Sequence, residues 1–159
     1  DALEKKRQLG LAFHKAIALY IQDDLDMDSI DERLVKPMEA FDEFWNNKIA
    51  DHRQVEIPRY HPKLKYCGKP DLVTADTIFE WKLRTYNPIT DPLQMAGYQH
   101  LCESEINHLT VVCFDLIGNC KMHGAWHMQA WSVFRKLLTK YKSEQKFNKL
   151  LNQWKGVVK

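Results

Sequence analysis

PDLVTADTIFEWK, residues 70–82, carries the clearest structural signal in this chain. Apolar residues alternate along both halves of the stretch, and the pair Ala75-Asp76 between them suits a tight hairpin turn. We therefore expect one strand over residues 65–74, distorted at Gly68 and Pro70, and a second strand over residues 77–84. A hairpin of this kind brings acidic side chains from its two strands together.

Asp71 and Glu80 are those acidic residues, one on each expected strand. Two neighbouring carboxylates repel each other, and a bound cation is the usual remedy. Alternation in the second strand gives it two faces: Phe79, Trp81 and Leu83 on an apolar face, and Ile78, Glu80, Lys82 and Arg84 on the other. An exposed strand shows the same pattern, and for Glu80 and Lys82 alone that reading is favoured. Because Asp71 is expected beside Glu80, a functional site becomes the favoured reading of Glu80 and Lys82.

The residue types in this hairpin are those of metal-dependent phosphodiester cleavage. Asp71 and Glu80 can each offer an oxygen to Mg²⁺ or Mn²⁺, and the backbone carbonyl of Trp81 can add a third. Water and a phosphate oxygen would fill the remaining positions. Lys82 can orient the attacking water or stabilise the pentavalent transition state.

Three further side chains are candidates for the same site. His14 lies four residues after Gly10 on an expected helix; it could complete the metal shell, which would favour Mn²⁺, or it could be an ordinary core or surface histidine. Gln94 and Tyr98 are four residues apart, so they share one helix face and could hold a phosphate or a base. The alternative is a helix that packs on the sheet with Gln94 and Tyr98 merely adjacent.

Periodicity predicts the rest of the elements. The expected helices cover residues 3–21, 29–49, 91–103 and 129–153, and the remaining strands cover residues 54–60, 108–116 and 120–126. Pro37 could divide the second helix, whereas Asp91 is expected to cap the third, with Pro92 as its first residue. The last helix is expected to bury Trp131, Phe134, Leu138, Tyr141 and Leu150. This order predicts an α/β fold with a mixed central sheet flanked by helices.

Composition limits the class of protein. The chain has 159 residues and is 45% hydrophobic, which fits one domain over residues 1–159. No apolar run approaches the roughly 20 residues that cross a bilayer, so no membrane is expected. Four cysteines without a Cys-x-x-Cys pair indicate reduced thiols and a cytoplasmic protein. Net charge is +2, but residues 131–159 hold 8 basic and 1 acidic side chains, among them Lys136, Lys140 and Lys142. These either contact a phosphate backbone or simply solvate a helix face.

Taken in order along the chain, these motifs resemble the PD-(D/E)xK nuclease superfamily, and most closely its RecB-like exonuclease branch. The matching residues are Gly10 and His14, Pro70-Asp71, Glu80-Trp81-Lys82, and Gln94 with Tyr98. The resemblance implies an αβββαβ core, dependence on Mg²⁺ or Mn²⁺, and DNA that is single-stranded or has free ends as substrate. It also implies an exonuclease of bacterial or phage origin that acts in recombination, repair or phage replication.

Two departures from the family bear on partners and cofactors. Some RecB-like nucleases hold an iron–sulfur cluster with one early cysteine and a late trio, a pattern that this chain lacks, so no cluster is expected. A Gly-rich phosphate loop is also missing, so unwinding would need a helicase or recombination partner. Other hypotheses remain open: a structure- or sequence-specific endonuclease, a catalytically inactive DNA-binding module, or a plain structural domain.

Overall fold

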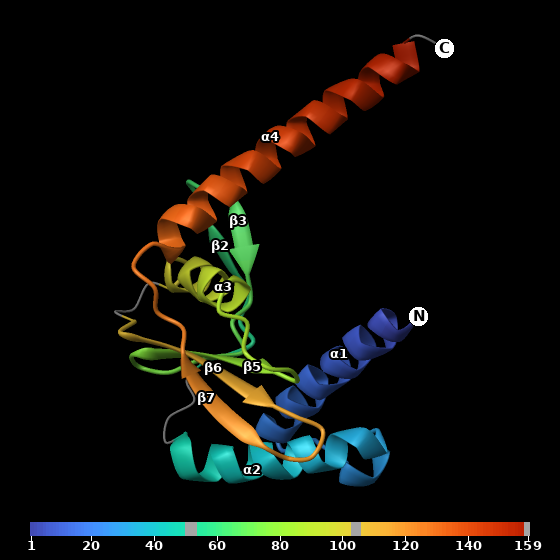
Figure 1. Ribbon diagram of the computed structural model, residues 1–159, viewed down its shortest axis with the longest axis vertical. Helices are drawn as coiled ribbons and strands as arrows, with labels where there is room; N and C mark the ends of the chain where they lie inside the picture. Colours follow the sequence, from blue (N-terminus) through green and yellow to red (C-terminus); the bar gives the residue numbers. More distant parts are fainter. Residues whose placement is uncertain (50–53, 103–105, 158–159) are drawn as a thin grey trace.

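The computed structural model describes residues 1–49, 54–102 and 106–157 (Figure 1). Its helices are α1 (Ala2–Ile21), α2 (Val35–Lys48), α3 (Thr90–Gln99) and α4 (Ala130–Val157), with 3-10 turns η1 (Met27–Ser29) and η2 (Glu32–Leu34). Its strands are β1 (Gln54–Val55), β2 (Arg59–His61), β3 (Tyr66–Gly68), β4 (Leu72–Val73), β5 (Thr77–Lys82), β6 (His108–Phe114) and β7 (Cys120–Gly124). None of the described helices is long and apolar enough to cross a membrane.

The central sheet has the strand order β1-β4-β5-β6-β7. β5 and β6 are parallel, and the other neighbours are antiparallel, so the sheet is mixed. Parallel neighbours need a crossover connection, which α3 provides between β5 and β6. The predicted α/β class, with a mixed sheet flanked by helices, is therefore confirmed.

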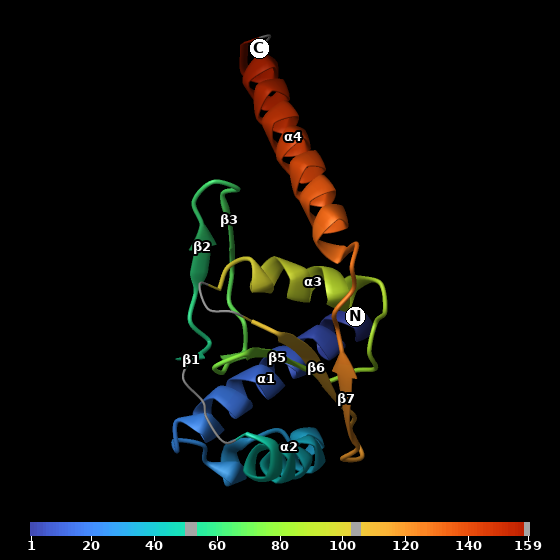
Figure 2. The ribbon, with the colours of Figure 1, turned by 90° about the vertical axis from the view of Figure 1, so that its left-hand side faces the viewer.

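Helices cover both faces of this sheet. α1 and α2 lie on one face, and α3 lies on the other (Figures 1 and 2). The first face has an aromatic core, in which Phe41 and Phe44 pack edge-on against Trp81 with ring centroids 5.4 and 5.8 Å apart. The second face holds a smaller core around Ile78, Met95 and Val111. Ile78 is as buried as Trp81, so both faces of β5 are inside the protein.

Residues 54–61 and 65–73 each form two short strands instead of the single strands expected from sequence. Glu56 has a φ of 49° and Pro58 follows, which ends β1 and lets the chain leave the central sheet. β2 and β3 then pair with each other as a separate hairpin beside the start of α4 (Figure 2). The chain rejoins the central sheet at β4, after the distortion predicted at Gly68 and Pro70.

α2 begins later than predicted, at Val35, after the two 3-10 turns. Pro37 lies in its first turn, where the missing N–H costs no helical hydrogen bond, so this proline does not divide the helix. Leu34, Met38 and Phe41, which recur at helical spacing, are buried and form the core-facing side of this segment.

The predicted start of α3 is wrong. Ile89, not Asp91, occupies the N-cap position, and Asp91 is a buried residue of the first turn. The helix ends at Gln99, short of the predicted end at Glu103, which lies outside the described residues.

α4 packs only through its first turns. Trp131, Phe134 and Leu138 are partly buried, but Tyr141 and Leu150 are 58% and 56% exposed, contrary to the prediction. The helix continues past α3 and the β2–β3 hairpin into solvent (Figures 1 and 2), so its later apolar side chains have no surface to pack on within the described residues.

Candidate active site

The register of the hairpin explains why its two acids meet. Leu72 pairs with Phe79 and Val73 with Ile78 in an antiparallel ladder. One step further along this register, Asp71 stands opposite Glu80. Residues directly opposite in antiparallel strands point to the same face. Both side chains are buried, with only 5% and 3% of their surfaces exposed.

Asp71 is held by contacts from two elements. Its Oδ2 accepts a hydrogen bond from the backbone N–H of Trp81 at 2.7 Å, and its Oδ1 lies 3.1 Å from Nδ1 of His14 on α1. Burial lowers the pKa of His14, but the hydrogen bond and charge of Asp71, with a contribution from Glu80, outweigh burial and raise it overall. α1 therefore supplies a side chain that orients one oxygen of Asp71.

Glu80 has two unlike oxygens. Oε1 accepts hydrogen bonds from Nζ of Lys82 and Nε2 of Gln94, each at 2.7 Å. Oε2 is buried and has no hydrogen-bond partner among the described residues. Burial, followed by the charge of Asp71, raises the pKa of Glu80 to about 7, although Lys82 opposes the shift. The free oxygen and the unfavourable charge both suit a site that receives a cation.

α3 contributes two linked side chains to the same cluster. Gln94 Oε1 lies 3.0 Å from Nζ of Lys82, and Gln94 Nε2 lies 2.9 Å from the hydroxyl oxygen of Tyr98. Burial and the charge of Glu80 raise the pKa of Tyr98, so its phenol stays protonated at neutral pH. The structure thus brings six side chains into one cluster: His14 of α1, Asp71 just before β4, Glu80 and Lys82 of β5, and Gln94 and Tyr98 of α3.

The ordinary readings of these residues fit the geometry less well. Glu80 is inside the protein, so it is not a solvent-facing strand glutamate. His14 touches Asp71, Gln94 donates to Glu80, and Tyr98 accepts from Gln94, so none of the three is merely adjacent to the site. These contacts place the side chains together without testing what each one does.

The donor set fits Mg²⁺ or Mn²⁺ but does not form a closed cage. No group of three or more His, Cys, Asp or Glu side chains in the described parts of the chain is arranged to hold a metal by itself. Mg²⁺ usually binds one or two carboxylates and keeps several waters, so two acids are sufficient. The N–H and C=O of one strand residue point to the same neighbouring strand, and Trp81 directs its N–H at Asp71. Its carbonyl therefore lies on the side of the acids.

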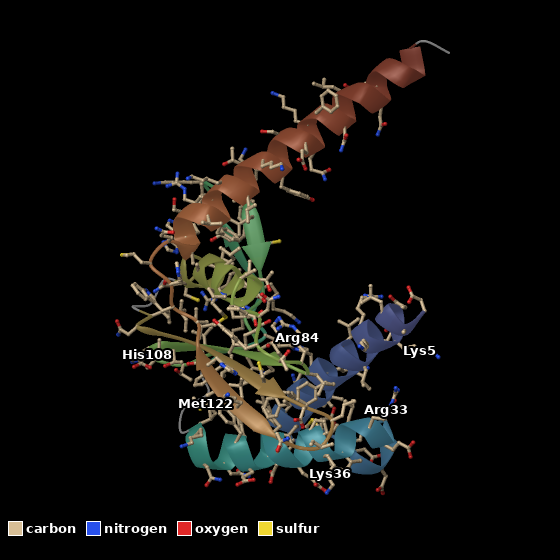
Figure 3. All side chains as sticks on the ribbon, in the orientation of Figure 1. Lys5, Arg33, Lys36, Arg84, His108 and Met122 are labelled. Carbon is tan, nitrogen blue, oxygen red and sulfur yellow. The ribbon has the colours of Figure 1, made fainter. Side chains whose placement is uncertain are left out.

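Sequence reasoning missed an ion pair beside the site, between the buried Asp91 and the exposed Arg84. Asp91 accepts two hydrogen bonds from the guanidinium of Arg84, one of them at 3.0 Å from Nη1, and a third from the N–H of Asn87 at 2.8 Å. Arg84 (Figure 3) lies just after β5, so this pair fixes the loop between β5 and α3. The pattern Asn87-x-x-x-Asp91 gave no sign of it, because Asp91 before a proline is typical of a helix cap.

Close packing at Gly97 fixes α3 from behind the site. A Cβ on Gly97 would come within 2.8 Å of the ring of Phe134 on α4, so the helices approach closely there. The hydroxyl of Tyr66 on β3 donates to the Gly97 carbonyl at 2.8 Å. Glycine is therefore required for this contact, one residue before Tyr98.

Several weaker candidates lie outside the network. Glu56 pairs with Lys69 at 3.1 Å, His123 stacks on Tyr86, and the Nδ1 of His127 accepts from the N–H of Gln129. Each of these side chains is thus engaged away from the two acids, and the ring of Tyr86 is covered by His123.

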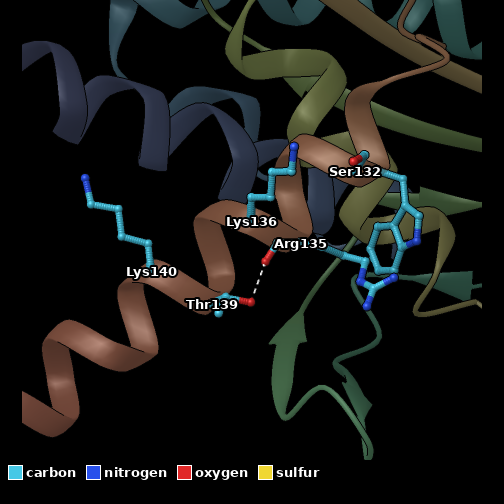
Figure 4. Close-up of a pocket in the computed structure, with 6 residues that line it drawn as sticks. Ser132, Arg135, Lys136, Thr139 and Lys140 are labelled. Carbon is cyan, nitrogen blue, oxygen red and sulfur yellow. Dashed lines mark hydrogen bonds between the residues drawn. The ribbon is translucent and has the colours of Figure 1, made fainter.

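The basic residues of α4 differ in what they contact. Lys142 donates to the carbonyl of Leu64 and so ties the helix to the β2–β3 hairpin, which removes it from the predicted set of backbone contacts. Figure 4 shows Arg135, Lys136 and Lys140 around a pocket of about 600 Å³ on the exposed side of the helix. Thr139 lies among them and donates to the carbonyl of Arg135 at 2.9 Å.

Comparison with known proteins gives a fold and no family. No protein-family model matches the chain. No curated protein matches it. The chain is similar to a crystal structure from Eubacterium rectale named "Putative exonuclease", with a TM-score of 0.62 and 8% sequence identity. The likeness covers 86% of this chain and 65% of that one, so the chain spans about two thirds of the structure that it matches. At this identity the likeness shows a shared fold alone.

Proposed function

We propose that this chain is a nuclease that hydrolyses phosphodiester bonds of DNA with Mg²⁺ or Mn²⁺. The observation that carries the proposal is Glu80. It is a buried carboxylate that faces a second one, with one oxygen bonded to Lys82 and Gln94 and the other without a partner among the described residues. Buried polar atoms in folded proteins are nearly always paired, so an unpaired carboxylate oxygen favours a site that receives a ligand. The name of the similar solved structure points to the same class of enzyme.

Asp71, Glu80 and the carbonyl of Trp81 are the groups that would hold the cation. When bound, such a cation lowers the pKa of a coordinated water and neutralises negative charge on the phosphate. His14 supports the site through Asp71, because its ring nitrogen orients one oxygen of that carboxylate. In the arrangement found here, His14 therefore acts on Asp71, and a direct role as ligand remains a proposal.

Lys82 is positioned to act on the phosphate. Its ammonium has three N–H donors, and two of them are directed at Glu80 Oε1 and Gln94 Oε1. The third can donate to a non-bridging phosphate oxygen or to the attacking water. In the reaction, a water oxygen bonds to phosphorus as the water gives up a proton, and the bond to the leaving sugar oxygen breaks as that oxygen takes up a proton from solvent. Lys82 stabilises the charge that builds up on phosphate during this exchange.

Gln94 and Tyr98 hold this arrangement in place. The amide of Gln94 bonds to Glu80, Lys82 and Tyr98 at once, so it fixes the distance between carboxylate and ammonium. Tyr98 keeps its proton and can donate it in a hydrogen bond to the substrate. We assign both residues to positioning and substrate contact.

An exonuclease is the form of the activity that we favour, in agreement with the name of the structural neighbour. Cutting from an end and cutting within a strand use the same catalytic groups, so an endonuclease is the principal alternative. A DNA-binding module without catalysis is less consistent with the complete set of Asp71, Glu80 and Lys82.

The direct test is digestion of linear single-stranded, linear double-stranded and closed circular DNA in Mg²⁺, Mn²⁺ or EDTA. We expect degradation of linear DNA that stops in EDTA, and a loss of about 10³-fold or more in Asp71→Asn and Glu80→Gln. Both substitutions keep the shape of the side chain and remove its charge. Lys82→Ala is expected to lose a similar factor.

Asp76→Asn is the matched control, because Asp76 is an exposed acid on the turn of the same hairpin. It should retain the parent's activity. Cleavage that survives EDTA or Asp71→Asn would rule out the proposed site. Cutting of closed circles would identify an endonuclease.

A further inference from the structure

A pocket of about 750 Å³ opens directly from the proposed active site, with which it shares His14 and Lys82. Its remaining walls come from the first half of α1, from Leu83 and Arg84 after β5, and from Leu116 in the turn between β6 and β7. This volume is within the about 300–1,000 Å³ of sites that bind small molecules.

One face of α1 forms a long wall of this pocket. Leu3, Arg7, Gly10 and His14 recur at intervals of three or four residues, so they lie in a row along the helix that ends at Asp71. A ligand bound along this row of residues would reach the two carboxylates.

The floor of the pocket is apolar and open. Leu3, Leu11 and Leu116 are 74%, 52% and 49% exposed, although leucine is usually buried. Contiguous exposed apolar surface beside a polar site is typical of a binding surface.

The rim of the pocket is basic. Lys6, Arg7 and Arg84 line it; Arg7 also bonds to Glu4 on the outer side of α1, and Arg84 also bonds to Asp91. Lys6 has no ion-pair partner within the described parts of the chain. An apolar floor with cations above it matches a nucleotide, whose base is flat and apolar on its faces and whose phosphate is anionic.

Gly10 keeps the pocket open. A Cβ built on this residue would meet no atom within 4 Å, although Gly10 lies in the middle of a helix where alanine is more stable by about 1 kcal/mol. Packing therefore does not require glycine here. Its absent side chain leaves free the space between the leucines and His14.

We infer that this pocket binds the base of an unpaired nucleotide next to the phosphate that is cut. The inference deepens the proposed nuclease function, on which it rests. A paired base offers only its edge, because stacking covers its faces, so a nucleotide in this pocket has left any duplex. The substrate of this site is then single-stranded DNA, or the frayed end of a duplex.

The test compares two short oligonucleotides in EDTA, one of thymidines and one with the same backbone and abasic sugars. The parent protein is expected to bind the thymidine strand about tenfold or more tightly, since one base contact has about that worth. Gly10→Leu should abolish this preference by filling the pocket. Leu116→Ser should reduce it, because the substitution makes the floor polar.

Ala12→Leu is the matched control, because it adds the same side chain to an exposed position of α1 that does not line the pocket. It should keep the preference. Equal binding of the two strands by the parent, or an unchanged preference in Gly10→Leu, would overturn the inference.

Digestion in Mg²⁺ separates this inference from the proposed function. Cleavage of DNA by a parent that shows no base preference would leave the nuclease intact and reject the pocket. A base preference that Gly10→Leu removes, in a protein that cuts no DNA, would leave a nucleotide pocket and reject the nuclease.

Discussion

Glu80 shows how a single residue can be costly for folding and necessary for chemistry. Its carboxylate is buried beside Asp71, and both effects raise its pKa to about 7 from a usual value of 4.5. Lys82 offsets only part of this, and Oε2 gains no hydrogen bond from the described residues. The protein therefore holds a charge in a place that folding alone would leave neutral.

Glu80→Gln is therefore expected to stabilise the protein in EDTA while it removes activity. The amide carries no charge to desolvate, and its oxygen can still accept from Lys82. We expect a rise of about 1 kcal/mol in the free energy of unfolding, measured by urea denaturation at pH 8. Glu39→Gln, an exposed change on α2, should stay within about 0.5 kcal/mol. A strongly destabilised Glu80→Gln would mean that the carboxylate is structural.

Asp91 predicts a pH dependence of stability. Burial raises its pKa, but hydrogen bonds from Arg84 and from the N–H of Asn87 outweigh burial and lower the pKa below its usual value of 3.8. A carboxyl whose folded pKa is lowered stabilises the fold above its unfolded pKa, and this contribution is lost as the pH falls through the folded pKa.

Asp91→Asn should therefore be less stable than the parent by about 1–3 kcal/mol at pH 6, since it leaves Arg84 without its charged partner. The difference in the free energy of unfolding between parent and variant should become smaller below about pH 4, where the parent carboxyl takes up its proton. Urea denaturation across pH 3–7 measures both quantities, with Asp76→Asn as the exposed control. A gap that stays constant with pH would contradict the ion-pair account.

Much of the proposed site follows from residue order alone. Alternation and a short turn predict that Asp71 and Glu80 meet, and helical spacing predicts that Gln94 and Tyr98 share a face. The bonds of Gln94 to both Glu80 and Lys82 depend on how α3 crosses β5, which no local pattern encodes. Asp91 was misread for the same reason, since its partner Arg84 reaches it across a loop.

At the scale of elements, local patterns predicted α1, β5, β6 and β7 well and failed where the chain changes sheets. The continuous strands expected over 54–60 and 65–74 are each divided, because Glu56 adopts a positive φ and β2 and β3 pair with each other. Periodicity identifies an extended segment but does not identify its partner. The exposed Tyr141 and Leu150 of α4 are the helical counterpart of this error.

Two helical glycines give a matched prediction about how elements pack. Gly97→Ala should lower the free energy of unfolding by about 1 kcal/mol or more, because the new methyl group overlaps the Phe134 ring and overpacking exceeds the gain in helix propensity. Gly10→Ala, in open space, should raise it by about 0.5–1 kcal/mol. Thermal denaturation of both variants checks the signs.

Phe134→Leu should restore part of the stability of Gly97→Ala, since it removes the ring that the methyl group meets. If Gly97→Ala and Gly10→Ala changed the free energy of unfolding in the same direction, α3 and α4 would not be in the close contact described.

At the scale of the whole molecule, the exposed basic surface of α4 is the feature most open to a charge test. Arg135, Lys136 and Lys140 lie on one side of a helix that runs past the β2–β3 hairpin (Figures 1 and 4). If a DNA backbone follows this side, each lysine that is neutralised removes a released counterion.

Replacing Lys136 and Lys140 together with glutamine should weaken single-stranded DNA binding and reduce the slope of log affinity against log salt by about 1.4. Fluorescence anisotropy between 50 and 200 mM salt, concentrations over which such slopes are measured, gives this value. Lys36→Gln, on the far side of α2, should leave the slope unchanged. An unchanged slope in the double variant would show that these lysines only solvate the helix.

Because α4 contacts α3 near its own first turns, a small tilt at this contact moves the far end of α4 by a larger distance. Beyond Lys142, its last anchor to the hairpin, the rod extends by roughly 20 Å at 1.5 Å per residue. A tilt of about 10° at the Gly97–Phe134 contact would move the end of α4 by roughly 6 Å, while α3 barely turns. A molecule bound at the end of α4 would therefore act, through this contact, on α3, the short helix that carries Gln94 and Tyr98.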